Sequence, residues 1–297
     1  MKNRIATSLY ILTALFAGSC NSIEIPANEL PDFEPKLSIN SSIDNENIIS
    51  LKIENTVNPF TTDVPAPYKD VDISLTGASS GTFPVSFDAS CNCFVSNKAA
   101  KPGEVYTLQV KDKLGKYSTA TATTYMPAKL LDKKVEFALN GGIDMEGKPS
   151  DLISVSWTDI AGSQYYIAHF LYYSEAADLF IPFDFALDDP SLAASETIKL
   201  DDGGYLFSDK LFNGQKKKIS VVPPGGLVAG NSDILYLVQI RTVSNEYFKY
   251  YNTLNAYREN ADLVASGSSE NTVIVYNNIE NGAGIFMGST IDSDTIR

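Results

Sequence analysis

Few residues of this 297-residue chain could support acid–base or nucleophilic chemistry. Its one histidine, His169, lies in a run of apolar and aromatic residues from Tyr165 to Tyr173, a pattern typical of a packed side chain. The sequence has no Gly-x-Ser-x-Gly segment that could supply a nucleophile. The acidic pairs Asp188-Asp189 and Asp201-Asp202 are too short a ligand series for calcium, and they are typical of a solvated face. We therefore predict no catalytic residues, no metal, no cofactor and no enzymatic activity.

Cys91 and Cys93, separated by Asn92, are the second chemical feature. An oxidising compartment would permit a disulfide between them, although the bridge would close a very small ring. Two half-buried free thiols are the alternative. Both are favoured over a metal site, because structural zinc needs four ligands and the only histidine is distant in sequence. The sequence leaves open whether the two sulfurs are joined.

Cys20 is the third chemical feature, and it follows an N-terminal segment with the composition of a signal peptide. Lys2 and Arg4 precede an uncharged apolar run that ends at Ala17, and Gly18 and Ser19 complete a set of small residues before the cysteine. This order is that of a secretory signal peptide over residues 1–19. It resembles the bacterial lipoprotein signal, which implies a lipid-modified N-terminal Cys20. Plain secretion, with Cys20 inside the leader, is the alternative.

The charge balance narrows the classes of partner. Removing residues 1–19 takes Lys2 and Arg4 from the 23 basic residues and none from the 36 acidic ones, which leaves 21 against 36. Nucleic acid binding needs a clustered positive surface, so we expect no nucleic acid partner. No later run is long or apolar enough for a transmembrane helix, and the only membrane contact that we expect is the lipid.

The spacing of apolar residues predicts a mainly β protein. After a Pro-rich tether over residues 20–33, residues 34–127 show repeated two-residue alternation, as in Ile49, Leu51 and Ile53, and turns separate the short strands. This pattern predicts an Ig-like or carboxypeptidase-regulatory-like β-sandwich.

Residues 128–297 should form a larger β domain. Trp157 closes one strand and Tyr165 begins the next after a short loop, an order that resembles two strands of fibronectin type III domains. We expect an inserted loop over Asp178 to Gly204, one α-helix capped by Ser244, and a strand at Val273 to Tyr276. In the C-terminal core segment that follows, Gly282 and Gly284 indicate backbone geometry or close approach that a side chain would block.

The inserted loop holds the best candidates for ligand or partner contact. Phe180, Phe183 and Phe185 lie in an acidic loop with no obvious core of their own. Exposed, they would form a platform for sugar rings or a patch for a partner. Alternatively, the loop would fold down as a cover over the second sandwich, and the usual burial of phenylalanine favours this arrangement at least as strongly.

Two segments carry a family resemblance over nearly the whole mature chain: Asp209-Lys-Leu-Phe-Asn-Gly214 and Asn278-Ile-Glu-Asn-Gly-Ala-Gly-Ile-Phe286. With the leader, the Met126-Pro127 boundary and the Ser244 helix, they resemble the Bacteroidota outer-membrane lipoproteins grouped as domain of unknown function 4249. Ala283 stands where the family is expected to have Leu. The resemblance implies an outer-membrane location and association with a TonB-dependent transporter, and it implies no catalytic residues.

We therefore expect a non-enzymatic outer-membrane lipoprotein that helps a TonB-dependent transporter to bind or take up an unidentified nutrient. A glycan-binding protein that acts alone is one alternative. An adhesin or pilus-type structural subunit is the other.

Overall fold

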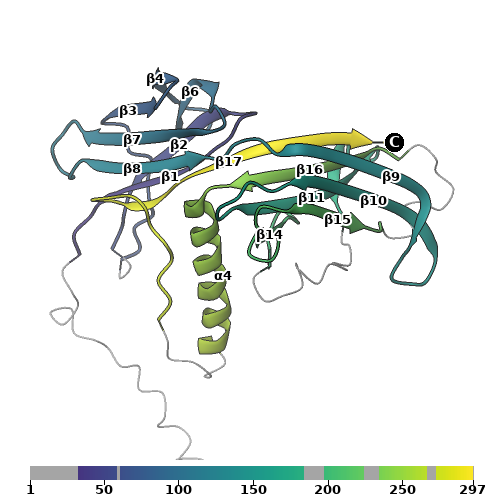
Figure 1. Cartoon of the computed structure of the whole chain (residues 1–297). Helices are drawn as coiled ribbons and strands as arrows, with labels where there is room; N and C mark the ends of the chain where they lie inside the picture. The colour runs from purple at the N-terminus through teal and green to yellow at the C-terminus, as the bar shows by residue number, and fades with distance from the viewer. Residues whose placement is uncertain (1–32, 59–60, 184–196, 224–233, 266–271, 297) are drawn as a thin grey trace, which may run out of the picture. The chain divides into compact units, whose positions relative to one another are not determined.

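A computed structural model describes residues 33–58, 61–183, 197–223, 234–265 and 272–296 (Figure 1). The chain divides into two units, Met1–Glu34 and Pro35–Arg297, and all strands and the helix described below belong to the second unit. The fold is mainly β with one helix, as the sequence predicted. None of the described helical residues forms a segment long and apolar enough to cross a membrane.

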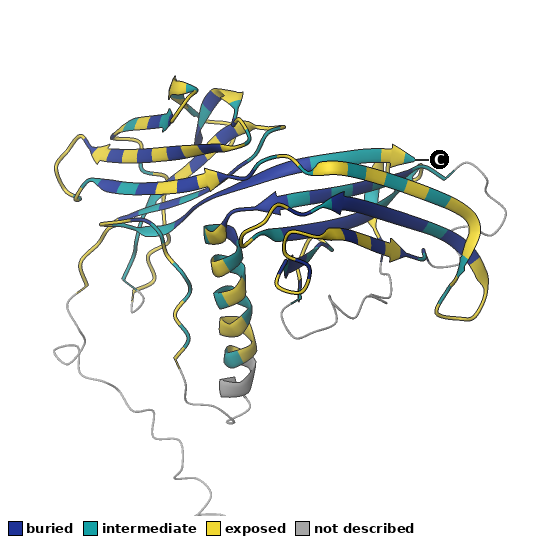
Figure 2. Cartoon of the chain, in the orientation of Figure 1, coloured by how far each residue is buried: buried dark blue, intermediate teal, exposed yellow. Residues whose placement is uncertain are grey.

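The first sandwich consists of two four-stranded layers. Its core is built by strict alternation, which is clearest in β7, where every second residue is buried (Figure 2). The strand orders β1-β2-β6-β5 and β3-β7-β8 correspond to the ABED and CFG sheets of an Ig constant-type domain, and β4 adds an edge strand beside β3. The predicted Ig-like sandwich is thus confirmed. The strands are β1 (Leu37–Ile43), β2 (Ile48–Asn55), β3 (Val71–Gly77), β4 (Gly81–Phe83), β5 (Val85–Asp88), β6 (Cys93–Ala99), β7 (Glu104–Asp112) and β8 (Ala120–Met126).

The second sandwich has the sheet composition of a fibronectin type III domain. One layer has the order β15-β10-β9, and the other contains β14-β11-β16-β17 with β12 paired to β11. Trp157 of β10 is fully buried between the layers and contacts Tyr166 and Phe212. The fibronectin-like arrangement predicted from the Trp and Tyr strands is therefore present. The strands are β9 (Leu131–Ile143), β10 (Pro149–Thr158), β11 (Tyr165–Ser174), β12 (Leu179–Pro182), β13 (Ile198–Lys199), β14 (Tyr205–Ser208), β15 (Lys216–Val221), β16 (Tyr236–Val243) and β17 (Ala283–Ile296).

The last strand, β17, belongs to both sandwiches. Its first part, Ala283–Gly288, pairs in parallel with β1, and its second part, Ser289–Ile296, pairs antiparallel with β16 (Figure 1). One ten-stranded sheet therefore runs through both halves of the chain. The first hydrophobic core consists of residues up to Met126 together with Ile279 and Phe286, the second core begins beyond residue 127, and the sheet continues through both.

The helix α4 (Asn245–Ala265) begins where the sequence predicted. Ser244 is its N-cap, since the Ser244 hydroxyl accepts a hydrogen bond from the Tyr247 amide at 3.2 Å. The prediction of a strand at Val273 to Tyr276 is wrong. That segment has no strand partner among the described residues and instead runs beside α4, where the Tyr276 amide donates to the Thr253 hydroxyl at 2.8 Å (Figure 1).

Candidate functional site

The predicted site residues that the structure describes do not come together in one place. Cys20 lies outside the described residues. The two other cysteines are joined as a disulfide between Cys91 and Cys93, with Cα atoms 5.2 Å apart, so the alternative left open by the sequence is decided in favour of the bridge.

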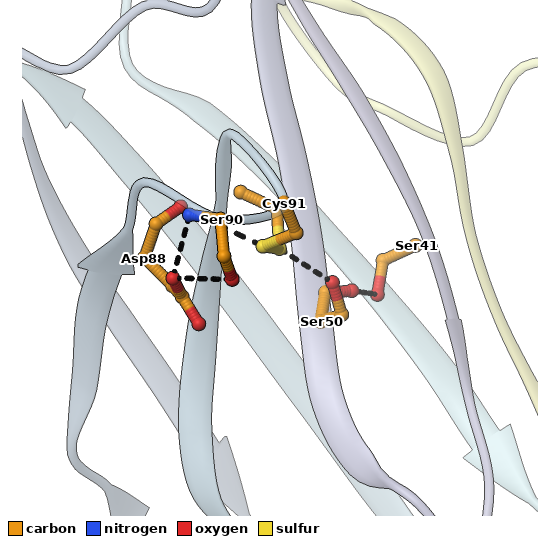
Figure 3. Close-up of a disulfide and its surroundings, with 6 residues drawn as sticks. Ser41, Ser50, Asp88, Ser90 and Cys91 are labelled. Carbon is orange, nitrogen blue, oxygen red and sulfur yellow. Dashed lines mark hydrogen bonds between the residues drawn. A yellow bond between two sulfur atoms is a disulfide. The ribbon is translucent and has the colours of Figure 1, made fainter.

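The disulfide lies at the turn between β5 and β6 (Figure 3). The Asp88 carboxylate accepts hydrogen bonds from the Ser90 amide at 2.8 Å and the Ser90 hydroxyl at 2.7 Å, and these bonds lower the pKa of Asp88. On the other side, the Ser50 hydroxyl of β2 donates to Cys93 Sγ at 3.1 Å. Cys91 is exposed, whereas Cys93 is only 5% exposed.

Of the three candidate phenylalanines, the two that are described, Phe180 and Phe183, do not form an exposed platform. Phe180 lies in β12 and is half-buried, with its ring 5.5 Å from that of Tyr173. Phe183 is buried and packs on Phe170 and Tyr236 of the second core, as in the covering alternative. Phe185 lies outside the described residues. Phe183 therefore offers no face to a sugar ring in this structure.

His169 is a buried strand residue with one polar partner. Its Nε2 lies 3.0 Å from Asp202 Oδ1 in the turn before β14, and this hydrogen bond lowers the pKa of Asp202 to about 2. Asp201 pairs with Arg258 of α4 at 3.0 Å. The two acids, expected to form only a solvated face, thus connect this turn to β11 and to the helix. Among the described residues, no three His, Cys, Asp or Glu side chains are grouped closely enough to hold a metal ion.

The segment Asp209–Gly214 holds a turn against the second core. Phe212 packs on Trp157, the Asn213 amide group donates to the Gly162 carbonyl at 2.8 Å, and the Gly214 amide donates to Asp159 at 2.6 Å. Burial raises the pKa of Asp209. The contacts of this segment are those of a packed turn.

The segment Asn278–Phe286 has a similar structural role at the start of β17. The Asn278 side chain accepts from the Phe286 amide at 2.9 Å and donates to the Phe286 carbonyl at 2.7 Å. Gly284 has φ +107°, and a Cβ there would collide with the backbone carbonyl of Ile39. A Cβ on Gly282 would lie 2.9 Å from the Leu37 carbonyl oxygen. The predicted close approach at both glycines is confirmed.

Sequence reasoning missed the surface around α4. Of the helix residues whose side chains are described, Tyr247 alone is buried (Figure 2). Tyr257 is 49% exposed, and Ile274 of the adjacent segment is 82% exposed. Lys249 Nζ lies 5.5 Å from the centroid of the half-buried Tyr276 ring. We call the partly or fully exposed residues Tyr250, Leu254, Tyr257, Ile274 and Tyr276 the α4 surface. The only sequence signal for it was the aromatic content of the helix, which equally suits a core.

A hydrogen-bonded junction holds the first turn of α4. The Ser244 hydroxyl also accepts from the Gly288 amide at 3.2 Å and from the Thr124 hydroxyl at 3.3 Å, and the Ser244 amide donates to the Gly288 carbonyl at 2.8 Å. The ring of Phe248 stacks on Tyr165 of β11 at 4.2 Å. Strands β8, β11 and β17 therefore hold the base of the helix. Beyond it, Tyr250 and Tyr276 are partly buried against the core around Tyr247, while Tyr257 and Ile274 stay exposed.

A shallow groove of about 410 Å³ lies between β3 and β5 in the first sandwich. Its apolar side chains are Val71, Ile73, Val85, Phe87 and Phe94. Lys69 Nζ lies 4.4 Å from the Phe87 ring centroid, and Lys113, the second cation of the lining, pairs with Asp72 of the same lining at 3.4 Å. A groove that combines an aromatic ring with polar and charged side chains can take a small polar ligand such as a sugar.

Comparison with known proteins gives a family and no function. A model of the family described as a domain of unknown function, DUF4249, matches residues 22–295. No curated protein matches the chain. Among solved structures, a chain described as the B domain of a biofilm-associated protein matches with 8% identity, 87% coverage of this chain, 85% coverage of that chain and a TM-score of 0.21, a similarity that supports no inference. Because the family match spans nearly the whole sequence, this protein belongs to the DUF4249 family.

Proposed function

We propose that this protein is a lipid-anchored, non-enzymatic accessory of a TonB-dependent outer-membrane transporter, and that it helps to bind or deliver a nutrient. The leader and Cys20 support the anchor. The transporter partner follows from the resemblance described above.

The observation that carries the proposal is the α4 surface. Interfaces are enriched in tyrosine and other aromatic residues, because these side chains bury much area and keep a polar tip. A helix of 21 residues is about 31 Å long. It contacts its own chain at its first turns and through the Arg258–Asp201 pair, whereas Tyr257 stays 49% exposed. A partner that covered Tyr257 and Ile274 would bury apolar area that the described residues leave in water.

Co-purification tests this proposal. The tagged chain is isolated from bacterial outer membranes in three forms: unchanged, Tyr257→Ser with Ile274→Ser, and Leu139→Ser. Leu139 is the control because it is also a large apolar residue, 66% exposed, and lies on β9, far in sequence from α4. We expect a TonB-dependent barrel with the unchanged and control chains and at least a tenfold lower yield with the double variant. Equal yields from all three, or no barrel at all, would contradict the proposal.

A glycan-binding module that acts alone is the second candidate. The groove beside Phe87 supports it better than the inserted loop does, because Phe183 is buried. Glycan-array binding that Phe87→Ala abolishes, in a chain that recovers no transporter, would favour this candidate. The adhesin alternative predicts polymers with an exchanged strand, which a strictly monomeric protein would contradict.

A further inference from the structure

The Cys91–Cys93 bridge is poorly placed to stabilise the fold. A disulfide stabilises mainly by restricting the unfolded chain, and its effect grows with the length of the loop that it closes. Here one residue, Asn92, lies between the cysteines. The turn is already held by the bonds from Ser90 to Asp88 and by the pairing of Asp88 with Cys93 at the ends of β5 and β6. The turn is therefore restricted even without the disulfide, and the disulfide adds little to the stability of the fold.

The two sulfurs have different surroundings (Figure 3). Cys91 is exposed at the turn, where another molecule can reach it. Cys93 is nearly buried, and its sulfur accepts the hydrogen bond from Ser50 at 3.1 Å. The Ser41 hydroxyl donates to the Ser50 carbonyl at 2.7 Å, which ties β2 to β1 at this point. A hydroxyl that donates to sulfur stabilises a thiolate more than a disulfide sulfur, because charge strengthens the bond.

We propose that Cys91–Cys93 is a thiol–disulfide exchange site for a dithiol, such as a pair of cysteines on another protein. Exposed disulfides are the ones that exchange readily, and the attacking group is a thiolate. This inference is independent of the α4 surface and of the transporter proposal.

The exchange is balanced in two steps. A thiolate of the dithiol attacks Cys91 Sγ, a new S–S bond forms, and the bond between the cysteines breaks with its electron pair on Cys93 Sγ. The Cys93 thiolate keeps the hydrogen bond from Ser50. The second thiolate of the dithiol then attacks its own partner sulfur and releases Cys91 as a thiolate. Both cysteines take up protons, so the bridge is reduced by two electrons and the dithiol is oxidised to a disulfide.

The first test compares the two thiols. In a full chain with Cys20→Ser, the further change Cys93→Ser leaves Cys91 as the only thiol, and Cys91→Ser leaves only Cys93. The rate of reaction with a chromogenic aryl disulfide is measured for each folded chain. We expect Cys91 to react at least tenfold faster than Cys93. Equal rates, or a faster Cys93, would overturn the assignment of Cys91 as the attacked sulfur.

The second test measures reduction of the intact bridge by dithiothreitol in the folded Cys20→Ser chain, with alkylation and mass spectrometry as the readout. We expect complete reduction without unfolding. Ser50→Ala should slow it roughly tenfold, the effect of one hydrogen bond to a charged group, and Ser50→Thr should restore the rate. Ser42→Ala, at an exposed serine of β1, is the control. A bridge that reduces only after unfolding, or a rate unchanged by Ser50→Ala, would overturn the proposal.

Discussion

Replacing Gly284 with alanine should break the strand that joins the two sandwiches. Gly284 lies in the part of β17 that pairs in parallel with β1, opposite Ile39. Its φ of +107° is a conformation that alanine rarely adopts, and the added Cβ would meet the Ile39 backbone rather than a side chain that could move aside. Neither problem can be relieved without shifting β1 or β17.

The cost has two parts. A non-glycine residue held in a sparsely populated backbone region costs about 1–3 kcal/mol. Overpacking against fixed neighbours costs about 1–3 kcal/mol more. We therefore expect Gly284→Ala to lower the free energy of unfolding by about 4 kcal/mol, a large part of the stability of a typical domain.

Urea unfolding followed by the fluorescence of Trp157 measures this loss in the second sandwich, where Trp157 is fully buried. Gly115→Ala is the matched control, because Gly115 also has a positive φ, +69°, but nothing lies within 4 Å of its added Cβ. The control should lose only about 1 kcal/mol. A Gly284→Ala loss no larger than that of the control would refute the close approach of β17 to β1.

Three further outcomes are expected. Ser244→Ala should lower the free energy of unfolding by about 2 kcal/mol in urea titrations, because the helix loses its cap and the Gly288 amide loses an acceptor; an unchanged midpoint would count against the junction. Burial opposes ionisation of Glu104, but hydrogen bonds from Ser80 and Ser79 outweigh the effect of burial and lower the Glu104 pKa from 4.5 to about 2. The stability that ionised Glu104 contributes is thus present above pH 4.5 and lost as pH falls toward 2. Between these pH values, the thermal unfolding temperature of Glu104→Gln should therefore depend less on pH than that of the unchanged chain. The same pH dependence in both chains would contradict this. Phe183→Ala should cost about 3 kcal/mol by the same urea assay, and a change below 1 kcal/mol would contradict its burial.

Local patterns in the sequence predicted much of the fold. Two-residue alternation located most strands of the first sandwich, because one face of each strand packs on a core and the other meets water. Ser244 and Glu246 marked the helix start, and the glycines of the C-terminal segment indicated close approach, since these signals depend on the residue itself and its immediate neighbours.

The pairing of strands that are far apart in the chain has no such local signal in the sequence. The parallel pairing of Ser38 with Ala283 joins residues at opposite ends of the chain, and an alternating pattern does not name a strand's partner. Val273 to Tyr276 has the composition of a strand, but the segment lies beside α4. There the Thr253 hydroxyl, and not another strand, accepts the hydrogen bond from the Tyr276 amide. The exposure of α4 was also unpredictable, because its aromatic residues suit a buried face equally well.

Cross-linking from the α4 surface tests the proposed function most directly. A photoreactive benzophenone side chain replaces Tyr257 in growing bacteria, and the same substitution at Leu139 is the control. We expect irradiation to join the chain covalently to a TonB-dependent barrel from position 257 and not from position 139. No barrel adduct from position 257, or equal adducts from both positions, would contradict the account.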